Sequence, residues 1–340
     1  MEGAYAMSDS GAAKVVIAER ALENLRTLLA DYGSPLIVTD ELIQSQYADI
    51  MEEVIEVPIR WVMASAYPDN APLDREIDII IGFGGGASLD VAKLIARDTN
   101  LDWISVPTAA SHDGIASEVA SISQDGYKYS VKCKGPLAVI ADISIISKAP
   151  PRLKLAGLGD IICKTSSLAE WKLAHEVKSE PFDEEVYTIV ENALTSVLKD
   201  DSFETLVRAE IDAGRAMSLF GSSRPCSGTE HAISHAMDRI DSNLHGLQVA
   251  FATPICLYYL QEAGYSEYKP ESVQEFMIDH QMPTTFEEIN SNLPAFLEDV
   301  QHALKIMRKR DRFSVLDHLK VNDDNLTKAL KDLGYYHPEF

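Results

Sequence analysis

Short apolar runs rich in β-branched residues alternate with amphipathic stretches through the first 150 residues of the chain. The runs are bounded by Gly, Pro, Asp or Asn, which is typical of strands. In the stretches between them apolar residues recur every three or four positions, as Leu22, Leu25 and Leu29 do, and this spacing indicates crossover helices. The alternation predicts a parallel sheet. The expected strands are residues 15–17, 36–39, 77–83, 103–106 and 137–140, and the expected helices are residues 19–32 and 89–96.

The pattern changes after Pro150 and Pro151, which cannot continue a strand or a helix. A chain of 340 residues also favours two domains over a single large core. We therefore expect an α/β protein in which an N-terminal Rossmann-like parallel-sheet domain, residues 1–150, precedes an all-helical C-terminal domain, residues 151–340. Helical spacing in the second half covers residues 161–175, 183–199, 202–220, 230–239 and 247–262.

A glycine turn, Gly84-Gly85-Gly86, separates the expected strand 77–83 from the following helix. Glycines permit positive φ and let backbone amides approach a pyrophosphate, and a helix N-terminus favours negative charge. The turn therefore fits a dinucleotide phosphate, with Lys93 as a cation nearby. A plain tight turn is the alternative, because the loose G-x-G-x-x-A pattern is weak by itself.

Asp40 directly follows the expected strand at residues 36–39. A carboxylate at this place can accept hydrogen bonds from an adenosine ribose, and its charge would favour NAD over NADP. The alternative is that Asp40 caps the N-terminus of the next helix.

The segment SVPTAASHDGIAS follows the expected strand 103–106 and holds His112 and Asp113. Catalytic loops of open α/β sheets gather at such strand ends. Asp113 is a candidate to hold a substrate hydroxyl, and hydroxyls in the loop are candidates to bind the nicotinamide or the phosphates. The alternative is that these residues only cap a turn and a helix. The hydroxyl residues are Thr108, Ser111 and Ser117.

Metal-capable residues gather in three segments of the second half, around Asp160, in SGTEHAISHAMD and at LHG. His231 and His235 are four residues apart and share one helix face, and His245 follows after a turn. Imidazoles with one carboxylate suit zinc or ferrous iron, and three protein ligands leave a position open for substrate. The alternatives are core histidines and, for Asp160, the N-cap of a helix that begins near Ile161.

Five motifs together, GGGASLDVAK, PTAASHDGIAS, APPRLKLAGLGDIICK, SSRPCSGTEHAISH and LHG, resemble the sn-glycerol-1-phosphate dehydrogenase family of the iron-containing alcohol dehydrogenase and dehydroquinate synthase superfamily. The resemblance runs from about Val15 to at least Ala252, and no motif is recognised beyond Glu262. It implies metal-assisted reduction of dihydroxyacetone phosphate to sn-glycerol 1-phosphate with NADH or NADPH, for the phospholipid backbone of ether lipids. Zinc is the usual metal of the family, and nickel or iron is the alternative.

The same resemblance implies roles for individual residues. It makes Asp160, His231 and His245 the metal ligands and places Asp113 and His235 at the substrate as catalytic residues. The cofactor would be lined by Gly84, Gly85, Gly86, Ala87 and Ser88 and by Thr108, Ala109, Ala110, Ser111 and Ser117, with Asp40 at the ribose. A polyol or glycerol dehydrogenase and a dehydroquinate-synthase-like lyase are the alternative functions.

The formal net charge of −23 argues against nucleic acid or an anionic membrane as partner, because both require a positive surface. A phosphate substrate would then need a local cation, for which Lys164 and Arg224 are the candidates nearest in sequence to the metal residues. The four cysteines are far apart, which fits a reducing cytoplasm. No signal peptide or membrane segment is expected, and a homo-oligomer is expected from base rates.

Overall fold

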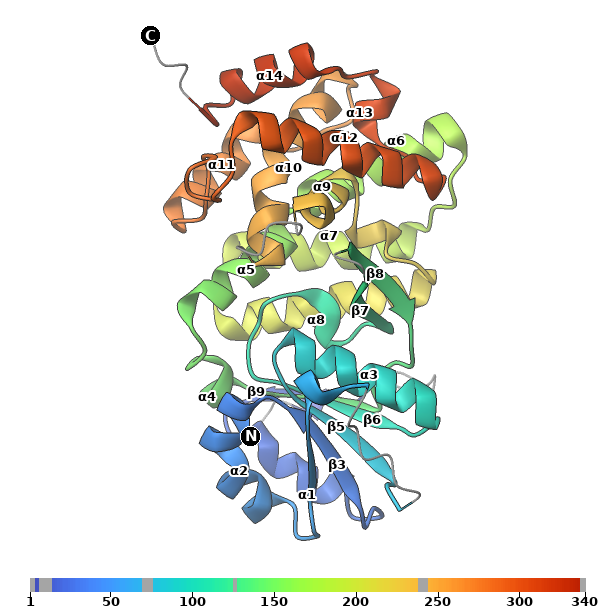
Figure 1. Ribbon diagram of the computed structural model, residues 1–340, viewed down its shortest axis with the longest axis vertical. Coiled ribbons are helices and arrows are strands. Elements are labelled where there is room, and N and C mark those ends of the chain that lie inside the picture. The colour runs from blue at the N-terminus through green and yellow to red at the C-terminus, as the bar shows by residue number, and fades with distance from the viewer. Residues whose placement is uncertain (1–3, 6–13, 69–75, 125–126, 238–243, 337–340) are drawn as a thin grey trace. The chain divides into compact units, whose positions relative to one another are not determined.

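The computed structural model describes residues 4–5, 14–68, 76–124, 127–237 and 244–336 (Figure 1). These residues form two compact units, which we treat separately. One unit lies within the ranges 1–122, 129–154 and 200–218, and the other within 123–128, 155–199 and 219–340. The domain boundary predicted at residue 150 stays a prediction.

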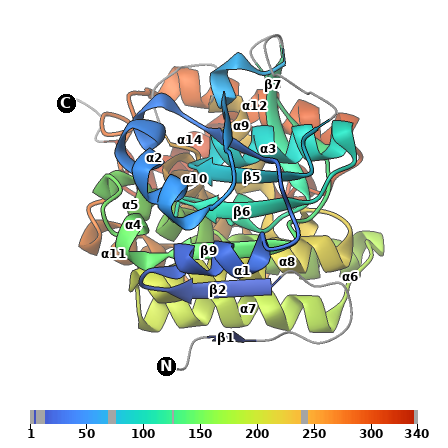
Figure 2. The ribbon, with the colours of Figure 1, turned by 90° about the horizontal axis from the view of Figure 1, so that it is seen from below.

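The first unit is built on a seven-stranded sheet with the order β1-β2-β9-β6-β5-β3-β4. All neighbouring strands are parallel except the pair β1 and β2, and Figure 2 shows the central strands side by side. The expected parallel sheet is confirmed, and each of its five expected strands is present within two residues at either end. The strands are β1 (Ala4–Tyr5), β2 (Lys14–Ala18), β3 (Pro35–Thr39), β4 (Arg60–Met63), β5 (Ile79–Gly84), β6 (Trp103–Pro107) and β9 (Ala138–Asp142).

Strands β3, β5, β6 and β9 are buried along their whole length, which explains their continuous apolar sequence. Helix α2 (Glu41–Val54), which the sequence analysis did not predict, covers part of the sheet through Tyr47, Met51 and Val54. The helix expected at residues 19–32 is instead a 3₁₀ turn, η1 (Ala21–Asn24), followed by the short α1 (Leu25–Leu28). The unit also contains α3 (Gly86–Thr99), α4 (Ile143–Ile146), all but the last two residues of α8 (Phe203–Phe220), and the 3₁₀ turns η2 (Ala64–Ala66) and η3 (Asp113–Ile115).

The second unit is helical, as expected, and α10 (His245–Glu262) lies at its centre. Almost every side chain of α10 is buried, and α9, α6 and α11 pack around it. The outer helices α12 and α14 are amphipathic and bury only one face. The other elements are α5 (Pro151–Ile162), which begins in the first unit, α6 (Lys164–Lys178), α7 (Glu184–Lys199), η4 (Arg224–Cys226), α9 (Thr229–Met237), α11 (Pro270–Asp279), α12 (Leu293–Lys309), α13 (Val315–His318) and α14 (Asp323–Asp332).

Two further features differ from the expected pattern. Pro151 begins helix α5, because proline lacks only an amide that the first helical turn leaves unbonded anyway. Strands β7 (Val119–Gln124) and β8 (Tyr127–Lys132), which were not predicted, form a separate two-stranded sheet. Among the described residues, no helix combines the length and apolar character needed to cross a membrane.

Candidate metal centre and dinucleotide turn

Asp160 lies in the last turn of α5 and is only 1% exposed. Because α5 runs from Pro151 to Ile162, Asp160 does not precede a helix, and the alternative role as an N-cap is wrong. Burial alone would raise the pKa of its carboxyl group, but Lys164 and His231 outweigh burial and hold that pKa well below its usual value. Asp160 therefore carries a negative charge, as a metal ligand requires.

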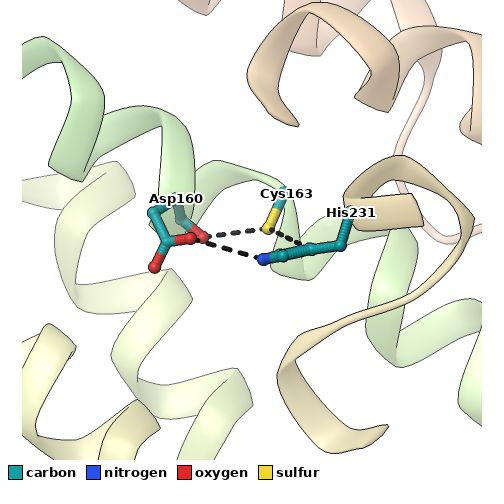
Figure 3. A group of neighbouring side chains, drawn as sticks. All are labelled: Asp160, Cys163 and His231. Carbon is teal, nitrogen blue, oxygen red and sulfur yellow. Dashed lines mark hydrogen bonds and ion pairs between the residues drawn. The ribbon is translucent and has the colours of Figure 1, made fainter. Parts of the chain in front are cut away.

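His231, on α9, faces Asp160 across the interior of the helical unit (Figure 3). Its Nε2 atom lies 3.5 Å from Oδ1 of Asp160. Two ligand atoms that each bond a tetrahedral zinc at about 2.0–2.1 Å would be roughly 3.3 Å apart. The separation therefore suits two ligands of a single ion.

His245, the first residue of α10, lies beside His231. The centroid of its ring lies 5.3 Å from that of His231. The three residues predicted from separate segments are thus neighbours in the helical unit, and one carboxylate with two imidazoles is a donor set that fits a divalent zinc, iron or nickel ion.

His235 lies beside the same group. Its ring stacks on that of His245, with the ring centroids 5.1 Å apart and the planes 19° from parallel. This position is next to the candidate metal ligands, and its predicted role at the substrate stays a prediction.

In the first unit, the glycine turn joins β5 to α3, with Gly85 as the N-cap residue. The glycines are not needed for positive φ, because Gly85 has a φ of −79° and neither Gly84 nor Gly86 is among the positive-φ residues. Gly84 and Gly86 are glycines because a side chain at either position would not fit. A Cβ on Gly84 would lie 2.6 Å from Oγ of Ser88, and one on Gly86 would overlap Nε2 of His112, whereas a Cβ on Gly85 would meet no atom within 4 Å.

The loop after β6 lies against this turn. The amide of Thr108 donates a hydrogen bond to the carbonyl of Gly84, 3.0 Å away. His112 caps η3 by accepting a hydrogen bond at Nδ1 from the amide of Gly114, and Asp113 is the first residue of η3. The hydroxyl of Ser117 is buried and lies 3.3 Å from the carbonyl oxygen of Val119. Ala109 and Ala110 are buried as well.

Asp40 is the N-cap of α2, as the alternative interpretation had it. Its Oδ1 accepts a hydrogen bond from the amide of Ile43 at 3.0 Å. Lys93, the cation expected near the phosphates, is fully buried and binds Asp90 and the carbonyl of Val119. Its positive charge is therefore paired with Asp90 inside the protein.

Comparison with known proteins decides the family. Residues 16–150 match the family model described as iron-containing alcohol dehydrogenase. In an alignment 329 positions long, which covers 91% of this chain and 92% of the relative, the chain is 34% identical to the glycerol-1-phosphate dehydrogenase [NAD(P)+] of Archaeoglobus fulgidus. A relative of the same name from Thermofilum pendens is 32% identical, over 94% of this chain and 96% of its own. The chain belongs to the glycerol-1-phosphate dehydrogenase family.

Solved structures show the fold on which this glycerol-1-phosphate dehydrogenase family member is built. A probable glycerol dehydrogenase from Sinorhizobium meliloti superposes with a TM-score of 0.76 at 20% identity, over 96% of this chain and 98% of the other. Glycerol dehydrogenase from Schizosaccharomyces pombe gives a TM-score of 0.73 at 19% identity, over 99% of this chain and 95% of the other. The expected α/β fold with a helical second part is confirmed.

Cys163 is a neighbour of the metal group that the sequence analysis missed. Ligand atoms of Asp160, Cys163 and His231 all lie within 4.8 Å of one another. However, the thiol donates to the carbonyl of Asp160 at 2.9 Å, and burial raises its pKa, so that the sulfur is a protonated donor. Its spacing of three residues from Asp160 was the available signal. His245 is not among these clustered residues, and its role as the third ligand stays a prediction.

The two cations considered for a phosphate are both interior. Lys164 is fully buried, with Nζ 3.5 Å from Oδ2 of Asp160 and 3.2 Å from the carbonyl of Cys226. The side chain of Arg224 is 7% exposed and pairs through Nε with Glu180 at 2.8 Å and through Nη1 with Glu170 at 3.6 Å. Both cations are therefore already paired inside the protein, and a role of either at the phosphate stays a prediction.

Proposed function

We propose that this chain reduces dihydroxyacetone phosphate to sn-glycerol 1-phosphate with NADH or NADPH, and thereby supplies the glycerol phosphate backbone of ether phospholipids. The observation that carries the proposal is the group of Asp160, His231 and His245 in one helical unit, in a chain whose curated relatives are named glycerol-1-phosphate dehydrogenase [NAD(P)+]. The chain is accordingly an oxidoreductase that acts on a CH–OH group.

The metal ligands would be Asp160, His231 and His245, and three protein ligands leave room for a substrate oxygen. A divalent ion held there, with zinc as the first candidate, supplies a Lewis acid for the negative charge that develops during hydride transfer. His235, stacked on His245, would exchange the proton of the product hydroxyl, because imidazole titrates near neutral pH. Asp113 would accept a hydrogen bond from a substrate hydroxyl.

The dinucleotide would bind at the turn that opens α3. The free space beside Gly85 and the amides at the helix N-terminus support a pyrophosphate there. Ala87, Ser88 and the loop Thr108–Ser111 with Ser117 would line the rest of the cofactor. Asp40 has already committed Oδ1 to Ile43, so its remaining oxygen Oδ2 would be the one to meet a ribose.

A single assay tests this function. Purified protein is given dihydroxyacetone phosphate or dihydroxyacetone with each reduced nicotinamide, and the product is resolved by chiral analysis. We expect fast oxidation of the nicotinamide only with the phosphate ester, and sn-glycerol 1-phosphate as product. Equal rates on dihydroxyacetone would instead make the chain a polyol dehydrogenase, and the absence of net nicotinamide oxidation would favour a lyase.

Removal of the metal gives an independent test of the same function. Dialysis against a chelator should abolish turnover, and zinc should restore it. Full activity in protein shown by elemental analysis to be metal-free would overturn the proposed role of the three ligands.

The place of the reaction and the assembly state belong to the same proposal. The cytoplasm is favoured because Cys133, Cys163, Cys226 and Cys256 are all free thiols. If the protein assembles, a symmetric homo-oligomer is expected, because most soluble oligomers are of this kind, and light scattering on the purified protein would measure its mass.

A further inference from the structure

Each imidazole of the candidate metal centre has its Nδ1 atom held by another side chain of the helical unit. Nδ1 of His231 lies 2.9 Å from Oε1 of Glu230. Nδ1 of His245 lies 2.8 Å from Oγ of Ser234. Neither Glu230 nor Ser234 is a metal ligand in the proposed set, and both side chains are fully buried.

Glu230 can only accept a hydrogen bond from His231. Its Oε1 also accepts a hydrogen bond from the amide of Gly228, 2.6 Å away, and its Oε2 accepts one from the hydroxyl of Ser166, 3.0 Å away. Gly228 and Ser166 both donate to the carboxylate of Glu230, which therefore acts only as an acceptor. In the contact between Oε1 and His231, the proton must accordingly lie on Nδ1 of His231. The Nε2 atom, which faces Asp160 at 3.5 Å, then keeps a lone pair for a metal.

Ser234 has the same effect on His245 by a different route. Its hydroxyl lies 2.9 Å from Oε1 of Gln248, which is an acceptor, so the hydroxyl proton points to Gln248. The Oγ atom of Ser234 is left to accept, and Nδ1 of His245 must donate to it. His245 therefore also keeps its lone pair on Nε2.

We infer that Glu230 and Ser234 are positioning residues that set the tautomers of His231 and His245, so that both imidazoles offer Nε2 to one divalent cation. The inference rests on the proposed metal centre and deepens it. A hydrogen-bonded partner on the second ring nitrogen fixes the orientation of a ligating histidine, and a carboxylate partner also raises its basicity. Both effects tighten metal binding without any contact between the positioning residue and the ion.

The cluster around Glu230 contains a natural control. Glu170 is equally buried, and its Oε2 accepts a hydrogen bond from the amide of Thr229 at 3.2 Å. A Cβ on Gly228 would lie 2.8 Å from Oε2 of Glu230 and 3.3 Å from Oε2 of Glu170, so the two carboxyl groups are close neighbours. Within the part of the chain that the structure describes, the carboxyl group of Glu170 pairs with Thr229 and Arg224 and not with an imidazole. A variant at Glu170 therefore perturbs the same buried cluster without touching a candidate ligand.

The test measures metal affinity rather than turnover. Apo-protein of Glu230→Gln, Ser234→Ala and Glu170→Gln is titrated with zinc in competition with a chromophoric chelator, and unfolding of each apo-protein is followed by circular dichroism. Glu230→Gln and Ser234→Ala should each raise the zinc dissociation constant roughly 10–100-fold, the cost typical of lost outer-shell partners. Glu170→Gln should bind zinc like the wild type.

The outcomes separate the inference from the function on which it rests. If Asp160→Ala abolishes zinc binding while Glu230→Gln and Ser234→Ala fold and bind as the wild type does, the positioning role is overturned and the metal centre stands. If Glu170→Gln weakens binding as much as Glu230→Gln, the effect belongs to the buried cluster and the inference fails. If Asp160→Ala still binds zinc, the metal centre of the proposed function fails. Should Glu230→Gln not fold, Ser234→Ala on the other imidazole decides.

Discussion

Gly159 and Gly246 touch backbone to backbone where α5 meets α10. A Cβ on Gly246 would overlap the carbonyl oxygen of Ala156, and one on Gly159 would overlap the carbonyl oxygen of Gly246. Each glycine directly neighbours a candidate metal ligand, Asp160 in one helix and His245 in the other. The absence of two side chains at this crossing therefore lets the segments that carry Asp160 and His245 pack in backbone contact.

Gly246→Ala should weaken both the fold and the metal centre. The added methyl group must displace the backbone of α5, and overpacking of this kind costs about 1–3 kcal/mol of unfolding free energy or more. Zinc affinity should fall as well, because Asp160 moves away from His245. Gly135→Ala is the matched control, since its Cβ would make only an ordinary contact, 3.5 Å from Cγ of Glu118. Urea unfolding and zinc titration measure the two effects, and wild-type values for Gly246→Ala would refute the close crossing.

Substitutions in the glycine turn should separate packing from cofactor binding. Gly86→Ala forces the His112 ring out of its place and should lower the stability of the protein without cofactor. Gly85→Ala meets no protein atom, so its stability should match the wild type, whereas its affinity for NADH should fall because the methyl group occupies the pyrophosphate space. Thermal unfolding and fluorescence titration with NADH test this difference. Unchanged NADH affinity in Gly85→Ala would place the pyrophosphate elsewhere.

Cys163→Ser should retain the metal. The thiol is protonated and donates to the carbonyl of Asp160, and a serine hydroxyl can do the same. We expect zinc to bind this variant stoichiometrically, as measured by elemental analysis after gel filtration. His245→Ala is the companion variant and should lose the ion. The reverse result would exchange Cys163 for His245 in the ligand set.

The stability of the protein should depend on pH through Glu170. Burial raises the pKa of this carboxyl group to about 7 despite the neighbouring Arg224, whereas its ordinary value is 4.5. The folded state therefore holds a proton that the unfolded state releases, and the stabilisation present below pH 4.5 is lost as pH rises toward 7. Above pH 7 the loss is complete.

Glu170→Gln mimics the protonated group and removes this dependence. The unfolding free energy of the variant relative to the wild type should rise between pH 4.5 and 7, by no more than about 1.4 kcal/mol per pH unit for one proton, and then stay level. Urea unfolding at several pH values gives both free energies. A difference that is constant across this range would show that Glu170 is ionised throughout.

The local pattern of apolar and polar residues was sufficient to predict much of the fold. The buried strands β3, β5, β6 and β9 were predicted because full burial on both faces makes their sequences continuously apolar. Helix α2 was missed although Tyr47, Met51 and Val54 have helical spacing, because polar residues outnumber apolar ones between them. The interval 161–175 was wrongly taken as one helix beginning after Asp160, since the break at Cys163 between α5 and α6 leaves no proline or glycine as a signal.

The sequence by itself determined the fold class, the family, and the residue types of the candidate metal centre. Strand and helix periodicity, and the Asp and His residues, can all be recognised within short segments of the chain. Only the tertiary structure decided which atoms of those residues are available to bind a metal ion. The proton on Nδ1 of His231 depends on Glu230 and Ser166 together. The backbone contact between the segments that carry Asp160 and His245 depends on two glycines 87 positions apart. Such relationships join residues that are distant along the chain, and no local pattern of hydrophobic and polar positions records them.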